Sequence, residues 1–146
     1  TSLAKDRDYV YSEVSPFGSQ KGGIWRTPLG GGPSSQIFAL ADGNPSSGIA
    51  ADGKGNVVWT NDVGEGTFTR AVRMYVASSG RVVELARGIR SELGVIPFFE
   101  RTATDGKAVY FATNQPSTLA QQEARCATDP NCPIDWAIYK VDTCAP

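Results

Sequence analysis

A short pattern that occurs three times constrains the fold of this chain more than any other feature. Each copy combines a β-branched residue with an aromatic residue, which is typical of a strand. The copies are Asp8–Ser12, Asn56–Asn61 and Ala108–Asn114. We take Tyr11, Trp59 and Phe111 as equivalent positions, separated by 48 and 52 residues. That period fits a unit of four short antiparallel strands with their loops.

An acidic turn precedes each copy of the pattern. The turns are Asp6-Arg7, Asp52–Gly55 and Asp105–Lys107. Asp and Gly accept the backbone conformations of tight turns, so each turn is predicted to join two antiparallel strands. Sixteen glycines and nine prolines also indicate short elements with many turns. The predicted fold class is therefore all-β.

A second element follows each copy and is interpreted as the outer strand of a unit. Its occurrences are Ile24–Pro28, Met74–Ala77 and Ile138–Asp142. Two apolar runs come next, Ile37–Leu40 and Val82–Ala86, and we expect them to be the innermost strands of the following units. Ser47–Ala51 and Ile96–Thr102 complete the cycle. The expected order is a third strand, a fourth strand and then two full sets of four.

This pattern resembles the six- and seven-bladed β-propeller families with YWTD-like, NHL-like or TolB-like repeats. In those families D-G-x-x-V-Y-W-T-N is followed by I-Y-R-V-P-L-x-G-G. The segments that carry the resemblance are Asp52–Asn61, Ile24–Gly32 and Asp105–Asn114. The resemblance implies consecutive four-stranded blades in a single domain over residues 1–146, with an inserted loop at 115–135. It implies nothing about a ligand.

The expected number of blades is too small for a closed propeller, which has about four to eight. We therefore expect the domain to be incomplete as a single chain. Exposed strand edges invite pairing, so other copies or another polypeptide are predicted to supply the missing blades. The expected assembly edge is the half-blade 9–29, and its central residues are Tyr9, Tyr11, Ile24 and Trp25.

The inserted loop contains two of the three cysteines. Cys126 and Cys132 flank a turn-rich segment, and we expect a disulfide between them that closes the loop. Cys144 remains, and it could pair with either of them or with another chain. A disulfide indicates a secreted or cell-surface protein. The chain has no His and its cysteines do not match a zinc spacing, so no metal site is predicted.

Catalytic residues are hard to find in this sequence. Without His, Ser-His-Asp and Cys-His systems are excluded within the chain. Asp62 and Glu65 follow the second aromatic strand and are interpreted as solvated loop acids, or at most as weak ligand-binding candidates. Gly64–Thr67 lacks the Lys of a phosphate loop, and Asp52–Asn56 lacks the distal Glu of a calcium loop. We predict no catalytic residue and no cofactor.

Five aromatic residues allow two interpretations. They could stack on sugar rings, as in a lectin, or they could form the core between blades. The residues are Trp25, Trp59, Trp136, Tyr75 and Tyr139. The core is the expected role for the set, and Trp136, next to the insertion, is the best candidate for an exposed aromatic that binds a ligand.

Charge and hydropathy narrow the class of partner. The formal net charge is −1, so no excess of Lys or Arg favours nucleic acid or an anionic membrane surface. No apolar stretch approaches the roughly 20 residues of a membrane-spanning helix. The predicted function is a non-catalytic extracellular binding or structural module that other copies or another chain complete. The alternatives are a fragment of a propeller enzyme, such as a lyase or glycosidase, and a carbohydrate-binding lectin.

Overall fold

The computed structural model describes residues 2–14, 22–40, 46–62, 70–88, 102–114 and 136–143, and its regular elements there are β-strands. The strands are β1 (Leu3–Lys5), β2 (Tyr9–Val14), β3 (Gly23–Pro28), β4 (Ser35–Ala39), β5 (Ser46–Ala51), β6 (Val57–Asp62), β7 (Arg70–Val76), β8 (Arg81–Gly88), β9 (Thr102–Thr104), β10 (Ala108–Asn114) and β11 (Trp136–Asp142). All their pairings are antiparallel. The predicted all-β class is confirmed.

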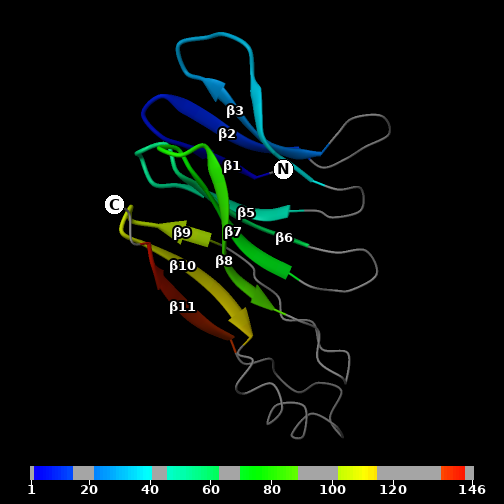
Figure 1. Cartoon of the computed structure of the whole chain (residues 1–146), viewed down its shortest axis with the longest axis vertical. Coiled ribbons are helices and arrows are strands. Elements are labelled where there is room, and N and C mark those ends of the chain that lie inside the picture. Colours follow the sequence, from blue (N-terminus) through cyan, green and yellow to red (C-terminus); the bar gives the residue numbers. More distant parts are fainter. Residues whose placement is uncertain are drawn as a thin grey trace, which may run out of the picture.

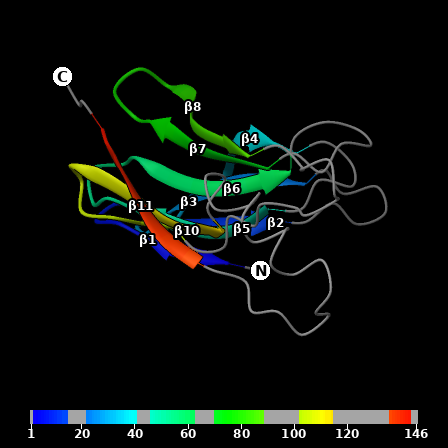
Figure 2. The ribbon, with the colours of Figure 1, turned by 90° about the horizontal axis from the view of Figure 1, so that it is seen from below.

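The strands form three separate sheets. Sheet 1 has the order β1-β2-β3-β4, sheet 2 has the order β5-β6-β7-β8, and sheet 3 has the order β11-β10-β9. None of the sheets closes on itself. Sheet 2 lies between the other two, and the first strands β1, β5 and β9 lie next to one another (Figure 1). Seen from below, β11 and β10 of sheet 3 come to the front (Figure 2).

The order of strands differs from the prediction. The runs expected to open new units are β4 and β8, which pair with β3 and β7 and so end sheets 1 and 2. The chain also starts with a first strand, β1, which at three residues is too short to give a sequence pattern. The predicted grouping of the strands into units is therefore wrong, because the Gly-rich turns before β4 and β8 close hairpins within one sheet.

The predicted acidic turns are confirmed as the connections between first and second strands. In each turn one oxygen of the Asp side chain accepts hydrogen bonds from two backbone N–H groups that follow it, at 2.8 to 3.1 Å. Gly53 and Gly106 adopt positive φ of 79° and 80° in two of these turns. Such a side-chain bond mimics a backbone turn, and glycine adopts positive φ without steric cost. Local sequence therefore specifies these three hairpins.

The backbone hydrogen bonds of the turns also show how the three sheets correspond. In each turn the N–H of the Asp donates to the carbonyl of the residue where the next strand starts. These bonds join Asp6 to Tyr9, Asp52 to Asn56 and Asp105 to Ala108. The Asp52 turn is one residue longer than the other two, so equivalent strand positions lie one residue further from its Asp.

This longer turn corrects the predicted equivalence of the aromatic residues. Counted from the turn bonds, Ser12 and not Tyr11 corresponds to Trp59 and Phe111. Tyr11 corresponds to Tyr110, and both hydroxyls donate to the carboxylate of their own turn. An offset of one residue moves a side chain to the opposite face of a sheet. Tyr11 therefore faces sheet 2, whereas Trp59 faces sheet 1 and Phe111 faces sheet 2 from the other side.

The hydrophobic core has two layers, one on each side of sheet 2. The residues of the layer between sheets 1 and 2 are Tyr11, Ile24, Val57, Trp59 and Tyr75. The residues of the layer between sheets 2 and 3 are Val58, Val72, Val109 and Phe111. Because successive strand residues point to opposite faces, β6 contributes to both layers. The expected core role of Trp59 and Tyr75 is confirmed, and Tyr139 packs against the second layer.

Candidate functional site

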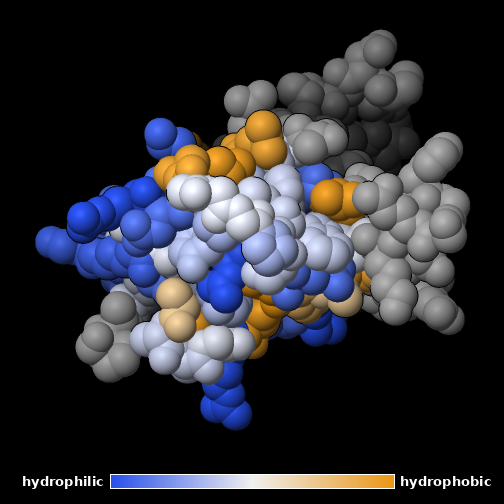
Figure 3. All heavy atoms as spheres, turned by 90° about the horizontal axis from the view of Figure 1, so that it is seen from above, coloured by the Kyte–Doolittle hydropathy of each residue, from blue (hydrophilic) through white to orange (hydrophobic). Residues whose placement is uncertain are grey.

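The outer face of sheet 1, which points away from sheet 2, is the first candidate surface. Tyr11 and Ile24 are buried toward sheet 2, so the residues that alternate with them point outward. The outward residues are Leu3, Lys5, Val10, Ser12, Trp25 and Thr27. Leu3 is 67% exposed. On the side of the molecule that carries sheet 1, apolar patches lie among polar side chains (Figure 3).

The outer face of sheet 3 is the second candidate surface. Val109 and Phe111 are buried toward sheet 2, so Tyr110 and Ala112 point away from it. Lys140 and Ile138 lie opposite them on β11. Ile138 is 79% exposed, the largest value among the exposed large hydrophobic residues of the described ranges. An isoleucine on a flat sheet face is thus open to solvent.

The two outer faces are of different and matching types. Val10 on sheet 1 corresponds to Val57, and Ser12 corresponds to Trp59, which cover the preceding sheet inside the molecule. Tyr110 on sheet 3 corresponds to Tyr11 of sheet 1 and Val58 of sheet 2, and each of these two residues faces the following sheet. The outer face of sheet 3 therefore has the same type as the face of sheet 1 that contacts sheet 2, and the outer face of sheet 1 has the same type as the face of sheet 2 in that contact.

Two arginines link sheets 1 and 2 across the contact between them. The Arg26 guanidinium lies over the Tyr9 ring at 5.1 Å and over the Tyr75 ring at 5.9 Å. The Arg73 guanidinium lies 5.1 Å from the Phe38 ring centroid. Arg26 belongs to sheet 1 and Arg73 to sheet 2, so the contact includes cation–π interactions in both directions.

Asp6 and Tyr11 form the best-buried polar pair of the turns. The Tyr11 hydroxyl donates to the Asp6 carboxylate at 2.6 Å, and its oxygen lies 3.4 Å from the carbonyl oxygen of Gly55 in the next turn. Burial raises the pKa of Asp6, but hydrogen bonds from Tyr11 and from backbone N–H groups outweigh it and leave the pKa below its usual value. Burial and then the Asp6 carboxylate raise the pKa of Tyr11 well above its usual range.

The corresponding pair of sheet 3 is exposed. Tyr110 donates to Asp105 at 3.0 Å. Backbone hydrogen bonds from Lys107 and Ala108, and then the bond from Tyr110, hold the pKa of Asp105 below its usual value. The same bond raises the pKa of Tyr110. Both pairs keep a neutral tyrosine and an ionised aspartate at neutral pH, which suits a structural turn rather than proton transfer.

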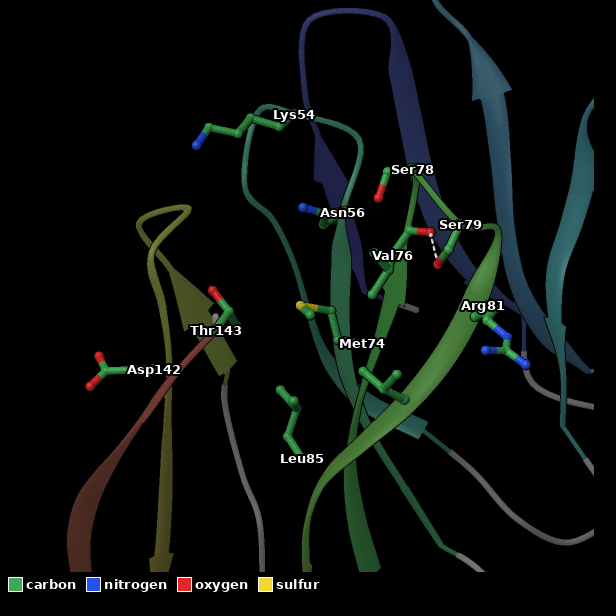
Figure 4. Close-up of a pocket in the computed structure, with 11 residues that line it drawn as sticks. Lys54, Asn56, Met74, Val76, Ser78, Ser79, Arg81, Leu85, Asp142 and Thr143 are labelled. Carbon is green, nitrogen blue, oxygen red and sulfur yellow. Dashed lines mark hydrogen bonds between the residues drawn. The ribbon is translucent and has the colours of Figure 1, made fainter. Parts of the chain in front are cut away.

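A groove of about 670 Å³ lies between sheet 2 and the end of β11. Its apolar wall comes from Met74, Val83 and Leu85, and Thr143 lies across the gap (Figure 4). The charged groups at its rim, Lys54 among them, point apart rather than toward one centre (Figure 4). The sequence signal for this wall is the alternation of Val83 and Leu85 along one strand, within the apolar run 82–86.

Two of the three predicted ligand-binding residues, Asp62 and Trp136, lie at strand ends away from the acidic turns. Asp62 ends β6 and pairs with Arg70, while Trp136 starts β11 and pairs with Asn114. The structure describes the backbone of these two residues and not their side chains. Glu65 lies outside the described residues, so the predicted ligand site stays a prediction.

The predicted disulfide also lies outside the described residues. This applies to Cys126, Cys132 and the whole insertion 115–135, and to Cys144. Within the described ranges, no three acidic or cysteine side chains come together to hold a metal ion. In the same ranges, no helix has the length and apolar character needed to cross a membrane.

The four residues of the predicted assembly edge do not lie at an edge. Tyr9 and Tyr11 are on β2, Ile24 and Trp25 are on β3, and each of these strands pairs with a neighbour on both sides. The expected edge required β2 and β3 to be the third and fourth strands of a unit, but they are the second and third strands of sheet 1. Trp25 instead belongs to the outer face of sheet 1, where it lies opposite Ser12.

Comparison with protein-family models, with curated proteins and with solved structures finds no match to this chain.

Proposed function

We propose that this chain is a non-catalytic binding and assembly module made of propeller-type blades, completed by other copies or by another chain. The observation that carries the proposal is the match between its two outer faces. Each sheet has one face of the type that covers the preceding sheet and one of the type that covers the following sheet. Sheets 1 and 3 each expose the type that is covered elsewhere in the molecule.

Apolar exposure supports the same proposal. Leu3 and Ile138 are 67% and 79% exposed, and they lie on the two opposite outer faces. Burial of one such side chain contributes about 1.5–3 kcal/mol. A specific interface needs about 1,000 Å² or more of buried surface, which calls for most of a sheet face on each partner. A second sheet is the partner that such a face covers best.

Another copy of the chain is the partner that the two faces favour. The outer face of sheet 3 in one molecule has the type that covers the outer face of sheet 1 in the next. Such a contact uses different surfaces on the two partners, so it closes into a ring or continues as an open filament. A ring of this kind would be a propeller assembled from several chains.

The cysteines support a location outside the cytoplasm. A disulfide between Cys126 and Cys132 persists in an oxidising compartment and is rare in the cytosol. This part of the proposal predicts that the protein purified from an oxidising compartment contains a disulfide. Alkylation with and without prior reduction, followed by mass spectrometry, counts the free thiols. Three free thiols without reduction would contradict it.

The assembly is tested by the native mass, measured with light scattering after size exclusion. The wild type is expected to give a multiple of 15.5 kDa. Ile138→Asp places a charge in the proposed contact and is expected to give the single-chain mass, because an unpaired buried charge opposes association. Ile138 is exposed within one chain, so the variant should keep its fold, which circular dichroism checks.

Val83→Asp is the matched control. Val83 is 38% exposed and lies on β8 of the central sheet 2, so it belongs to neither outer face. This variant is expected to keep the native mass of the wild type. A wild type that stays at 15.5 kDa, or an Ile138→Asp variant that keeps the assembled mass, would overturn the proposed self-assembly.

A further inference from the structure

Strand β11 is the outermost strand of sheet 3, and in the described part of the chain no strand pairs with its outer edge. Sheets 1 and 2 each have a fourth strand at this place, β4 and β8. An unpaired edge presents a row of backbone N–H and C=O groups that can pair with an extended segment. The groove of Figure 4 lies beside this edge.

The contact between sheets 1 and 2 shows what fills the equivalent groove. Val141 pairs with Val109, and Tyr75 pairs with Val57. Because these two valines hold the same position in their sheets, Val141 corresponds to Tyr75. Val82 of β8 pairs with Tyr75 and packs against the core layer between sheets 1 and 2. A strand next to β11 would thus place a side chain beside Val141 and cover the groove.

The third strands of sheets 2 and 3 also correspond one position further on. Tyr139 lies opposite Phe111 as Arg73 lies opposite Trp59. Glu84 of β8 pairs with Arg73, and their side chains form an ion pair at 3.6 Å. The missing strand would therefore have its next inward residue beside Tyr139.

The exposure of the groove residues fits the missing strand. Val83 is 38% exposed, and Met74 and Leu85 are half-buried at the edge of the second core layer. On the other side of sheet 2, the Phe38 ring packs on Trp59 at 5.1 Å, and Val82 packs against the same layer. The difference is that both sheets of the first layer have a fourth strand, β4 and β8, whereas sheet 3 of the second layer has none among the described strands.

We infer that the outer edge of β11 binds an extended segment of another polypeptide, which pairs antiparallel with it as the fourth strand of sheet 3. The segment carries an apolar residue beside Val141 and further apolar residues at alternate positions, which cover Met74, Val83 and Leu85. This inference deepens the proposed function and rests on it, because it names the kind of segment that completes one sheet.

The strand that fills the equivalent place in sheet 2 supplies the probe. A fluorescein-labelled peptide with the sequence of β8, residues 81–88, and the substitution Glu84→Val, which makes both inward positions apolar, is titrated with the protein and its fluorescence anisotropy is measured. Saturable binding is expected. A second peptide with proline at two alternate positions is expected not to bind, because proline removes ladder donors and clashes within a strand pair.

Two variants of the chain test the place of binding. Val83→Lys introduces a charge into the groove, and the affinity for the peptide is expected to fall about tenfold or more, which corresponds to at least about 1.4 kcal/mol. Val83 is partly exposed, so a lysine is accommodated with its amine in solvent before the peptide binds. Leu29→Lys, far from the groove, is expected to bind the peptide as the wild type does.

Hydrogen exchange supplies an independent readout of the edge. The peptide is expected to slow exchange of backbone amides in β11 and to leave those of β1 unchanged. No binding at up to about 1 mM peptide, equal binding by the Val83→Lys variant, or equal binding of the proline peptide would overturn the inference. If the native mass is a multiple of the chain mass while the peptide does not bind, this inference fails and the proposed assembly stands.

Discussion

The hydroxyl of Tyr11 donates a hydrogen bond of 2.6 Å to the carboxylate of Asp6, and this pair lies where the turn of sheet 1 meets sheet 2. Tyr11 is 1% exposed and Asp6 is 8% exposed. The same bond recurs between Tyr110 and Asp105 at 3.0 Å, where no described sheet covers it. One turn motif therefore occurs in a buried and an exposed setting within one chain, so each pair is a control for the other.

Tyr11→Phe is expected to lower the free energy of unfolding by about 1–3 kcal/mol, because a buried carboxylate oxygen loses its donor. Tyr110→Phe is expected to cost less than about 0.5 kcal/mol, since water can replace the lost hydroxyl. Urea unfolding followed by tryptophan fluorescence measures both. Equal losses in the two variants would contradict the difference in burial.

Stability is expected to depend on pH through the same carboxylates. Asp6 has a lowered pKa in the folded state, so it contributes stability above its unfolded pKa, near 3.9. This contribution is lost as the pH falls through the lower, folded pKa. The free energy of unfolding of the wild type should therefore decrease as the pH falls from about 5 to below 3.

Asp6→Asn removes the titrating group and tests this pH dependence. The variant should be less stable than the wild type at pH 7 and should lose less stability on acidification. Some dependence should remain, because hydrogen bonds also hold the pKa of Glu84 and Asp105 below their usual values. Gly30→Ala, which changes no titrating group and has no atom near its Cβ position, is the control and should keep the wild-type slope. Parallel curves for the wild type and Asp6→Asn would exclude Asp6 as a source of the slope.

Trp59 offers a test of what the core requires. Its side chain is fully buried against Phe38, so Trp59→Ala is expected to cost about 3–5 kcal/mol. Its indole N–H is buried and no described residue accepts its hydrogen bond. Trp59→Phe keeps most of the packing and removes this unpaired donor, so it should cost less than about 1.5 kcal/mol. A phenylalanine variant as unstable as the alanine variant would show that the indole N–H is needed.

Gly23 is expected to tolerate no side chain. It is buried at the start of β3, and a methyl group there would overlap the backbone carbonyl of Phe38 and the amide of Gln36. Gly23→Ala should therefore destabilise the protein by about 1–3 kcal/mol or more, since backbone has to move. Gly30→Ala, where no atom lies near, is the matched control. Similar melting temperatures for the two variants would contradict the close approach of β3 and β4.

Local chemistry accounts for the parts of the fold that the sequence predicted. The acidic turns were recognised because the Asp side chains bond to backbone N–H groups only two to four residues away. The strands β2, β6 and β10 were recognised from their β-branched and aromatic residues. The candidate surfaces were not recognised, because an exposed Ile138 and a buried Val109 look alike in a list of apolar residues.

The all-β class and the three hairpins at the acidic turns could be predicted from the sequence, because each depends on residues close together in the chain. The grouping of the strands into sheets and the face of each aromatic residue depend on the tertiary structure. The extra residue in the Asp52 turn shifts the strand that follows it by one position, and a side-chain period of two turns that shift into a change of face. Tyr11 therefore packs on sheet 2, while Ser12, the true counterpart of Trp59, points outward.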